Sequence, residues 1–162
     1  MLRNIQDFEY NHVFLMVQCN IILVDDGTEA IGFTACANDE QNYDINEIVL
    51  FGRELTNYGG YYNTQTSSFI CPVDGVYVFS VTTNVNYGDV IVTIMRNDVD
   101  LSAVWGRTDD EPFTHSTNMV VTECLAGDVV WPRVSFSGGT GGIHSNSNYC
   151  LTTFSGVLIK TV

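Results

Sequence analysis

The stretch "FICPVDGVYVFSV", Phe69–Val81, contains the strand that decides the fold. Its "PVDG" predicts a turn, and the alternating residues that follow predict a β-strand. A strand on the surface of a small antiparallel domain normally has one polar face. Here Tyr77 and Phe79 lie on one face of the strand. Val76 and Val78 lie on the other, so we expect both faces to be covered.

The chain of 162 residues is long enough for one globular domain with its own core. Hydrophobic residues make up 45% and charged residues 15%, which excludes a disordered acidic tail. There are 19 Asp and Glu against 6 Lys and Arg, for a formal net charge of -13. Nucleic acid and anionic membranes require a basic patch, so neither is an expected partner. Basic ligands or divalent cations suit this charge, as does a surface that only keeps the protein soluble.

Short apolar runs separated by turn-forming residues fill the chain from Ile31 onward. Val, Thr, Tyr and Phe dominate the runs, as is typical of strands, and no window has a sustained helical period. We expect strands near Ile31–Cys36, Glu47–Phe51, Ser68–Cys71, Gly75–Asn84, Val90–Met95, Leu101–Trp105, Asn118–Leu125, Val129–Phe136 and Leu151–Lys160. Segments between them, such as "NYG" and "SGGTGG", predict turns or connections. The pattern is typical of an antiparallel sandwich or barrel.

Several other strands are also apolar on both faces. "VIVTIM" places Val90 and Val92 on one side and Ile91 on the other. "TFSGVLI" places Phe154 and Leu158 together, with a glycine between them where only a small residue fits. A second apolar face on a central strand most often meets a partner subunit, which favours a homo-oligomer. The alternative is that loops of the same chain cover it.

Residues 1–30 are an N-terminal extension or an atypical signal peptide, and residues 31–162 form the domain. The apolar segment Val13–Val24 is too short, and too interrupted by polar residues, to span a membrane. Thr28 and Ala30 offer a cleavage site, whereas nearby aspartates disfavour one. The sequence therefore predicts a secreted protein and no membrane insertion.

The five cysteines contain no CxxC pair and no zinc-binding spacing; they are Cys19, Cys36, Cys71, Cys124 and Cys150. Disulfides are compatible with this number, but even four cysteines allow three pairings. Cys71 and Cys124 lie in apolar strand contexts, where a cysteine can also serve as a small buried hydrophobe. The pairing therefore stays open at this point.

A series of residues at fixed spacings distinguishes this chain from other all-β sequences. In "FGRELTNYGGYYNTQTSSFICPVDGVYVFSV" the fixed points are Phe51, Asn57, Tyr62, Phe69, Gly75, Tyr77 and Phe79. This spacing resembles the signature of the C1q globular domain, within the C1q and tumour necrosis factor-like superfamily. The upstream "IGFTACA" and the downstream "ECLAGDVVW" and "TFSGVLI" extend the resemblance over residues 31–162.

The resemblance implies an all-β fold, a ten-stranded antiparallel jelly-roll β-sandwich that assembles as a trimer. It implies core or trimer-interface roles for Phe51, Tyr62, Phe69, Tyr77, Phe79, Phe154 and Leu158. It also implies that Gly75 and Gly127 are turn residues. Two departures stand out: Val81 replaces a usual aromatic, and the chain has no Gly-X-Y stem. The chain thus resembles a head-only member, which puts a complement role through collagen-bound proteases in doubt.

No catalytic residues are expected. The three histidines share no metal motif, and Ser155 in "TFSGV" lacks the first glycine of a nucleophile elbow. "SGGTGG" has no Lys-Ser or Lys-Thr ending and no following helix, so we expect a mobile connection between strands rather than a phosphate loop. Trp131 follows two valines in a strand and is expected in the core. We therefore expect no required cofactor, with Ca²⁺ as the one candidate.

The best candidate site is Trp105–Glu111. Asp109, Asp110 and Glu111 offer the hard oxygen ligands that Ca²⁺ prefers, and some C1q-domain proteins bind calcium through acidic residues of this loop region. An alignment without gaps places that family's ligand positions near Gly106 and Thr114 instead, so a solvated acidic loop is the alternative.

In the same segment, Trp105 and Arg107 are candidate ligand contacts. Arginine pairs with carboxylate or phosphate groups, and the alternative for Arg107 is a salt bridge to Asp109 or Asp110.

These observations and the resemblance predict a secreted, non-enzymatic recognition protein. Its ligand would be a microbial glycan, a lipopolysaccharide or a protein, bound with the avidity of a homotrimer in innate immunity. The alternatives are a signalling ligand for a cell-surface receptor, like tumour necrosis factor or the synaptic organisers of the family, and a structural matrix protein.

Overall fold

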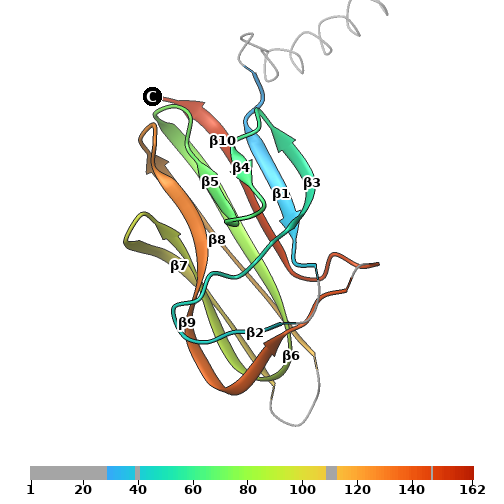
Figure 1. Ribbon diagram of the computed structural model, residues 1–162. Helices are drawn as coiled ribbons and strands as arrows, with labels where there is room; N and C mark the ends of the chain where they lie inside the picture. Colours follow the sequence, from blue (N-terminus) through green and yellow to red (C-terminus); the bar gives the residue numbers. More distant parts are fainter. Residues whose placement is uncertain (1–28, 39–40, 109–112, 147) are drawn as a thin grey trace, which may run out of the picture.

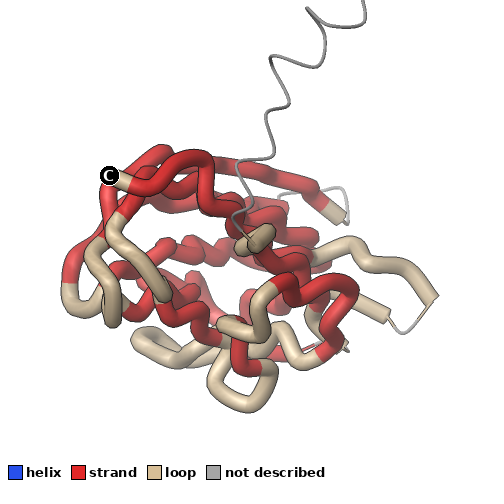
Figure 2. The backbone as a smooth tube through the Cα atoms, turned by 90° about the horizontal axis from the view of Figure 1, so that it is seen from above, coloured by secondary structure: helices blue, strands red, loops and turns tan. Residues whose placement is uncertain are grey.

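The computed structural model describes residues 29–38, 41–108, 113–146 and 148–162. Every regular element in these ranges is a β-strand (Figures 1 and 2). The strands are β1 (Gly32–Cys36), β2 (Gln41–Asn42), β3 (Arg53–Tyr58), β4 (Tyr62–Asn63), β5 (Ser68–Ile70), β6 (Gly75–Arg96), β7 (Val99–Thr108), β8 (Thr114–Cys124), β9 (Val129–Ile143) and β10 (Thr153–Thr161). The N-terminal segment, residues 1–28, lies outside the described residues.

Strand β6 belongs to both layers of the sandwich. Its first part, from Gly75 to Val85, pairs with β10 on one side and with β8 on the other. Its second part, from Gly88 to Arg96, pairs with β7 and β9. The first sheet therefore has the order β3-β1-β10-β6-β8, and the second has the order β7-β6-β9-β5-β4. All pairings are antiparallel, which confirms the expected jelly-roll sandwich.

The tripeptide "NYG" at residues 86–88 is a corner within β6, not the turn between two strands that the sequence predicts. The register of β6 against β9 shifts on both sides of Tyr87. Gly88 has a φ of 74°, a left-handed conformation that glycine adopts without strain. Bulges of this kind bend a strand and increase its twist. One strand thereby passes from the first sheet into the second.

The segment Glu47–Phe51, expected as a strand, is irregular, and the true strand β3 follows it. Only one isolated bridge, between Ile48 and Arg133, links the segment to β9. The backbone N–H of Leu50 donates to the Tyr43 hydroxyl at 3.1 Å, and that of Phe51 donates to Ser67 Oγ at 2.7 Å. Because side chains take these donors, no ladder can form there.

Two further expectations about β9 are wrong. Its backbone runs through "SGGTGG", so this segment is part of a strand and not a connection between strands. Trp131 is half-buried on the outer side of β9, where its indole N–H donates to the carbonyl oxygen of Asn97 at 3.1 Å. A tryptophan needs a partner for this donor, and the turn after β6 supplies it outside the core.

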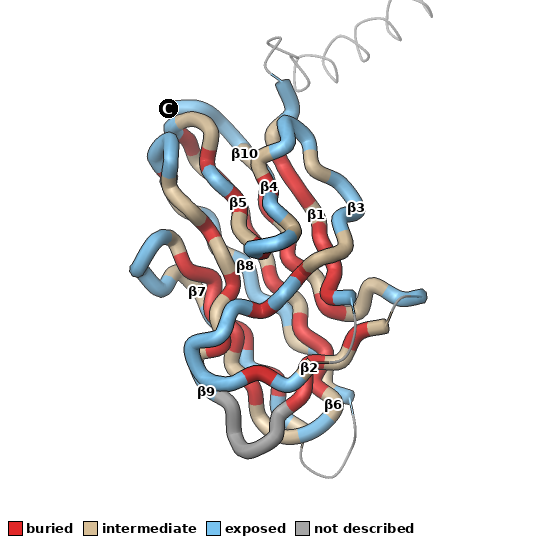
Figure 3. Tube along the Cα trace, in the orientation of Figure 1, coloured by how far each residue is buried: buried red, intermediate tan, exposed pale blue. Residues whose placement is uncertain are grey.

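Aromatic side chains fill the space between the sheets. The Phe33 ring stacks on Tyr62 and Phe69, with ring centroids 4.3 and 5.1 Å apart. Phe154 meets Phe33 edge-on at 4.9 Å. Val81, where the family usually has an aromatic, is also buried in this core. Figure 3 shows how buried and exposed residues alternate along the strands, as side chains do on a pleated sheet.

Two glycines allow close approach at β10. A Cβ atom on Gly156 would lie 2.5 Å from the ring of Phe79 and 2.6 Å from that of Phe33, so only glycine fits there. A Cβ atom on Gly75 would lie 2.7 Å from the carbonyl oxygen of Lys160. Gly75 therefore begins β6 and is not the turn residue that the resemblance implies, whereas Gly127 lies in a turn with a φ of 93°.

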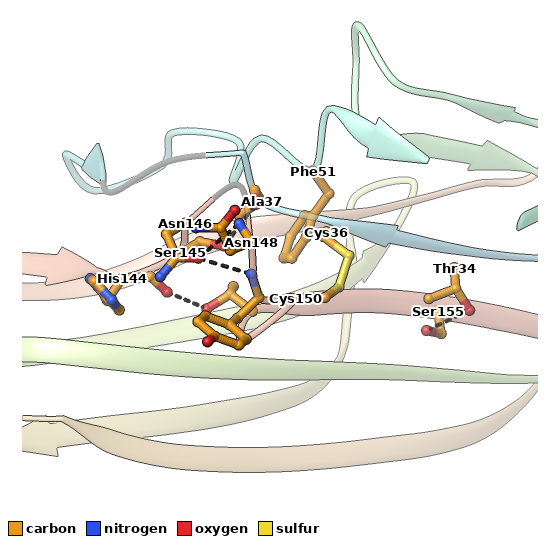
Figure 4. The surroundings of a disulfide bond; sticks show 12 residues. Thr34, Cys36, Ala37, Phe51, His144, Ser145, Asn146, Asn148, Cys150 and Ser155 are labelled. Carbon is orange, nitrogen blue, oxygen red and sulfur yellow. Dashed lines mark hydrogen bonds between the residues drawn. A yellow bond between two sulfur atoms is a disulfide. The ribbon is translucent and has the colours of Figure 1, made fainter. Parts of the chain in front are cut away.

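Cys36 and Cys150 form a disulfide across 114 residues of sequence (Figure 4). It joins the end of β1 to the segment that precedes β10. The same region is held by Ser145 Oγ, which donates to the carbonyl oxygen of Ala37 at 2.7 Å. Such a bond is typical of proteins that fold in an oxidising compartment.

Candidate functional site

An exposed row of three apolar side chains crosses the outer face of the second sheet. Ile91 of β6 pairs with Trp105 of β7 on one side and with Phe136 of β9 on the other. The Trp105 side chain is 55% exposed, and that of Phe136 is 43% exposed. Their neighbours Val90, Val92 and Val104 are buried, which fixes the row on the outer face. We call Trp105, Ile91 and Phe136 the aromatic strip.

A β-bulge places Phe136 in this strip. The register of β9 against β6 runs from Val92–Val134 to Ile91–Phe136, so Ser135 is an extra residue. Without it, Phe136 would have the same orientation as the buried Val134 and would enter the core. The bulge therefore turns an aromatic ring outward, a use of bulges that is common near binding sites.

Polar and charged groups border the aromatic strip. Arg107 lies 6.0 Å from the ring centroid of Trp105, within the range of a cation–π contact. Its Nε is 3.6 Å from Oδ1 of Asp89. On the other side, the Thr93 and Ser135 hydroxyls hydrogen-bond to each other. The site thus has a flat apolar centre and neutralised, hydrogen-bonding edges.

The structure describes only two of the ligand-binding residues predicted from the sequence. Trp105 and Arg107 both face outward from β7, as a ligand contact requires. Asp109, Asp110 and Glu111, the candidate calcium ligands, lie outside the described residues. Within the described residues, no group of three or more His, Cys, Asp or Glu could hold a metal ion.

The alternative calcium positions, Gly106 and Thr114, show no ligand-like geometry. Gly106 is buried, and a Cβ atom there would meet Val85 in the core. Thr114 Oγ1 donates to the carbonyl oxygen of Arg107 at 2.7 Å. This hydrogen bond ties the start of β8 to β7, so it serves the fold.

Sequence reasoning missed Asp89, Ile91 and Phe136. Asp89 was not considered as the partner of Arg107, because 18 residues separate them and only the β6–β7 pairing brings them together. Phe136 is the last residue of an expected strand, and the sequence does not show to which face of the sheet its side chain points. The only usable signal was the two-faced pattern of "VIVTIM", which left Ile91 without a partner in the core.

The outer face of the first sheet carries a second apolar surface. Val78 of β6 pairs with Val157 of β10 and with Val121 of β8, and Met119 follows on β8. Val157, Val121 and Met119 are 49%, 61% and 64% exposed. We call Val78, Val157, Val121 and Met119 the apolar band. It answers part of the question raised by Val76–Val81: the valines that do not face the core, Val76 and Val78, are only half-buried in the single chain.

A shallow hollow of about 190 Å³ adjoins this band. Thr34, Ser80 and Ser155 form its polar wall. The rest of its lining consists of Phe33, Val78, Gly156 and Val157. Ser155 Oγ donates to Thr34 Oγ1 at 3.2 Å, so these hydroxyls are already partly satisfied. The hollow is therefore suited to receive an apolar side chain rather than a charged one.

The residues assigned to core or trimer interface lie on the inner side of the sheets. All but one are at most 4% exposed; they are Phe51, Tyr62, Phe69, Tyr77, Phe79 and Phe154. Leu158 is half-buried and packs against the same core. Val78 and Val157 of the apolar band are sequence neighbours of these residues and therefore point to the opposite side of the first sheet.

Tyr62, a core residue, has a hydroxyl whose pKa is strongly raised. Burial, with the Glu54 charge, raises the pKa of Tyr62 to about 12, although a hydrogen bond with Ser67 opposes the change. Tyr62 donates its hydroxyl proton to the carbonyl oxygen of Phe51 at 2.9 Å. This hydroxyl is therefore held in its neutral form to position a loop, and it does not reach a surface site.

Comparison with known proteins agrees with this geometry. The family model described as "C1q domain" matches residues 32–159. Complement C1q tumor necrosis factor-related protein 6 of Mus musculus is 31% identical over 113 residues, which is 69% of this chain and 42% of that protein. The protein of the same name in Rattus norvegicus is 30% identical over 113 residues, 69% of this chain and 43% of that protein. The chain thus spans less than half the length of these relatives.

Solved structures give the same result for the fold. The globular domain of zebrafish complement 1qA protein superposes with a TM-score of 0.65 and 19% identity, covering 82% of this chain and 99% of that one. Murine APRIL superposes with a TM-score of 0.62 and 10% identity, covering 82% and 100%. In the described residues, no helix is long and apolar enough to cross a membrane. The chain belongs to the C1q domain family, whose members are non-enzymatic proteins.

Proposed function

We propose that this protein is a secreted recognition module that assembles as a homotrimer and binds a microbial surface glycan through the aromatic strip. The observation that carries the proposal is the exposed row of Trp105, Ile91 and Phe136 on the sheet opposite the apolar band. The Cys36–Cys150 disulfide supports secretion, because such bonds persist in oxidising compartments. Recognition of this kind would serve innate immunity.

The apolar band supports assembly through the first sheet. Val121 and Met119, on the edge strand β8, are each more than half exposed and lie beside Val78 and Ser80 of β6. Adjacent exposed apolar residues of this size usually mark a protein interface. Second and third copies of the chain, packed on this band, would leave the second sheet of each copy outward. Three strips on one head would then bind a repetitive surface with avidity.

A sugar ring suits the aromatic strip better than a charged ligand does. The C–H face of a pyranose is flat and apolar, and it can pack on an indole ring while its hydroxyls contact polar neighbours. Arg107 and Asp89 form an ion pair beside Trp105 and so offer both a donor and an acceptor. The formal charge of -13 opposes polyanions. We therefore expect neutral glycans, or the neutral sugars of a lipopolysaccharide, to bind best.

A glycan array with the purified full-length chain tests this proposal. Trp105→Ala and Phe136→Ala should each weaken binding of any glycan that the wild type retains. The matched control is Tyr149→Ala, because Tyr149 is 64% exposed but lies away from the strip, before β10. Equal binding by all three variants would contradict the assignment of the strip. Absence of any glycan binding by the wild type would contradict the function.

A protein ligand is the second candidate, and one observation favours it. Trp105 of the strip lies beside Arg107, and tryptophan and arginine are enriched in binding hot spots between proteins. In that case the protein would act as a signalling ligand for a cell-surface receptor. Saturable binding to one membrane protein, lost in Trp105→Ala and unaffected by free sugars, would favour this second function.

A further inference from the structure

The thiols of Cys71 and Cys124 lie against each other between the two sheets. Cys71 directly follows β5 of the second sheet, and Cys124 is the last residue of β8 in the first. Both residues are fully buried, and both are reduced in the structure. The two thiols are close enough for each to shift the pKa of the other. They therefore form a dithiol pair that spans the sandwich.

Backbone hydrogen bonds hold this pair in place without help from the sulfur atoms. The N–H of Cys71 donates to the carbonyl oxygen of Asp128 at 2.8 Å, and its carbonyl oxygen accepts from the N–H of Gly127 at 2.8 Å. Cys71 is thus fixed to the turn that follows Cys124. Cys124 is fixed by its pairing with Gly75 in β6. The position of each cysteine is set by the fold, so their contact is a fixed feature of the native chain.

We propose that Cys71 and Cys124 form a second disulfide bond, which joins the two sheets at the end of the sandwich where β6 begins. The Cys36–Cys150 bond connects the end of β1 to the segment before β10, and β1 and β10 are neighbours in the first sheet. It does not link the first sheet to the second, and in the described residues the two sheets are joined covalently by the backbone alone. A chain that forms one disulfide meets an oxidant, and the same oxidant would act on a second pair of adjacent thiols.

The oxidant is a disulfide, either small, such as oxidised glutathione, or that of an oxidoreductase. The Cys124 thiolate attacks one sulfur of this disulfide, forms a mixed disulfide and releases one thiolate. Cys71 loses its proton to that leaving thiolate and attacks the Cys124 sulfur. The Cys71–Cys124 bond forms, and the second thiolate leaves and takes up the proton originally lost by Cys124. Two cysteines are oxidised, and one disulfide is reduced to two thiols.

The charges around the pair favour Cys124 as the attacking thiol. Arg96 donates a hydrogen bond to the carbonyl oxygen of Glu123, next to Cys124. The neighbouring Cys71 thiol and the positive charge of Arg96 both lower the pKa of Cys124. The neighbouring Cys124 thiol and burial raise the pKa of Cys71. Because both side chains are buried, the exchange takes place while the sandwich closes or during local opening.

Peptide mapping of the full chain tests the bond. The protein is unfolded and reduced, then refolded in buffers that contain reduced and oxidised glutathione in different ratios. Free thiols are blocked under denaturing conditions, and the protein is digested with trypsin without reduction. Cleavage after Arg53, Arg96, Arg107 and Arg133 places Cys71 and Cys124 in separate peptides. We expect these two peptides to be recovered as a linked pair in oxidising buffer and as blocked thiols in reducing buffer.

The Cys36–Cys150 bond is the internal control, because it reports whether a given buffer was oxidising enough. Blocked thiols at Cys71 and Cys124 in a sample where Cys36 and Cys150 are linked would overturn the proposal. A bond from Cys71 or Cys124 to any other cysteine would overturn it as well.

Thermal unfolding gives a second measurement. Dithiothreitol should lower the Tm of the oxidised wild type by more than it lowers that of a Cys71→Ala/Cys124→Ala variant, in which only Cys36–Cys150 can be reduced. Equal shifts would overturn the proposal. If the double variant does not fold, Cys124→Ser takes its place, since serine fills nearly the same volume and cannot form the bond.

Discussion

The outer faces of the two sheets differ, although the same strand supplies the centre of each. Val78, in the first part of β6, lies in the middle of the apolar band between Val157 and Val121. Ile91, in the second part of β6, lies in the middle of the aromatic strip between Trp105 and Phe136. The band has aliphatic neighbours and hydroxyls around it, whereas the strip is bordered by an ion pair.

This difference teaches which face is suited to which task. A permanent interface between subunits is usually aliphatic and lacks charge, like a domain core divided in two. A ligand site combines aromatic rings with a few polar groups that fix orientation. The corner at residues 86–88 lets one strand serve both faces, because it carries β6 from one sheet into the other.

The largest expected effect comes from two matched substitutions on β6, each of which introduces an aspartate. Val78→Asp should break the trimer into single chains, because an aspartate in an apolar interface costs about 3 kcal/mol or more when it has no partner. Ile91→Asp, at the centre of the other face, should leave the trimer intact and abolish ligand binding. Sedimentation velocity of both variants, with glycan binding, checks this. A trimer in Val78→Asp, or a monomeric wild type at micromolar concentration, would contradict the role of the band.

Substitution of Gly156 tests the contrast between the inner and outer sides of β10. A Cβ atom on Gly156 meets two core rings, so Gly156→Val should lower the free energy of unfolding by about 1–3 kcal/mol. Ser155→Ala, on the outer side, loses only a partly exposed hydrogen bond to Thr34 and should cost about 1 kcal/mol or less. Urea denaturation measures both. A larger loss in Ser155→Ala than in Gly156→Val would be incompatible with the packing described.

The bulge at Ser135 predicts opposite behaviour for two nearby residues. Phe136→Ala should lower the free energy of unfolding by under about 1 kcal/mol and reduce glycan affinity by about tenfold, because the ring faces outward. Val134→Ala, in the core, should cost about 2 kcal/mol of stability and leave affinity unchanged. Urea denaturation combined with glycan titration separates the two. A large loss of stability in Phe136→Ala would show that the ring is not on the surface.

A smaller effect is expected from the ion pair at the edge of the strip. Asp89→Asn removes the partner 3.6 Å from Arg107, and an exposed pair of this kind contributes about 0–1 kcal/mol. The Tm of Asp89→Asn should therefore differ little from that of the wild type, and the difference should become smaller as salt is added. Glycan affinity should fall only a few-fold. A loss as large as that of Trp105→Ala would mean that Asp89 contacts the ligand directly.

The smallest effect concerns calcium. Binding by Asp109, Asp110 and Glu111 stays a prediction of the sequence, and it predicts a heat of Ca²⁺ binding by calorimetry that is lost in D109N/D110N/E111Q. Neither assembly nor the strip should change on addition of a chelator, since no metal-ligand cluster occurs elsewhere in the described residues. Absence of both heat and thermal shift in the wild type would end the hypothesis.

Particular residues show which features of the fold and of the site could be predicted from the sequence. The place of Gly156 between Phe154 and Leu158 was predictable, because alternation along one strand decides which side chains are neighbours. The role of "NYG" was not, because a turn and a bulged corner use the same residue types. Trp105 and Arg107 were found as candidates, whereas Ile91 and Phe136 join them only through the pairing of three strands.

By itself, the sequence determined the family, the all-β character and most of the aromatic side chains that fill the core. These depend on spacing along the chain and on the period of two along a strand, which are local properties. Only the tertiary structure decided that β6 is continuous, that Phe136 faces outward and that Cys36 pairs with Cys150. The physical reason is that register and bulges are set by the neighbouring strand, and cysteine pairing by contacts between distant segments.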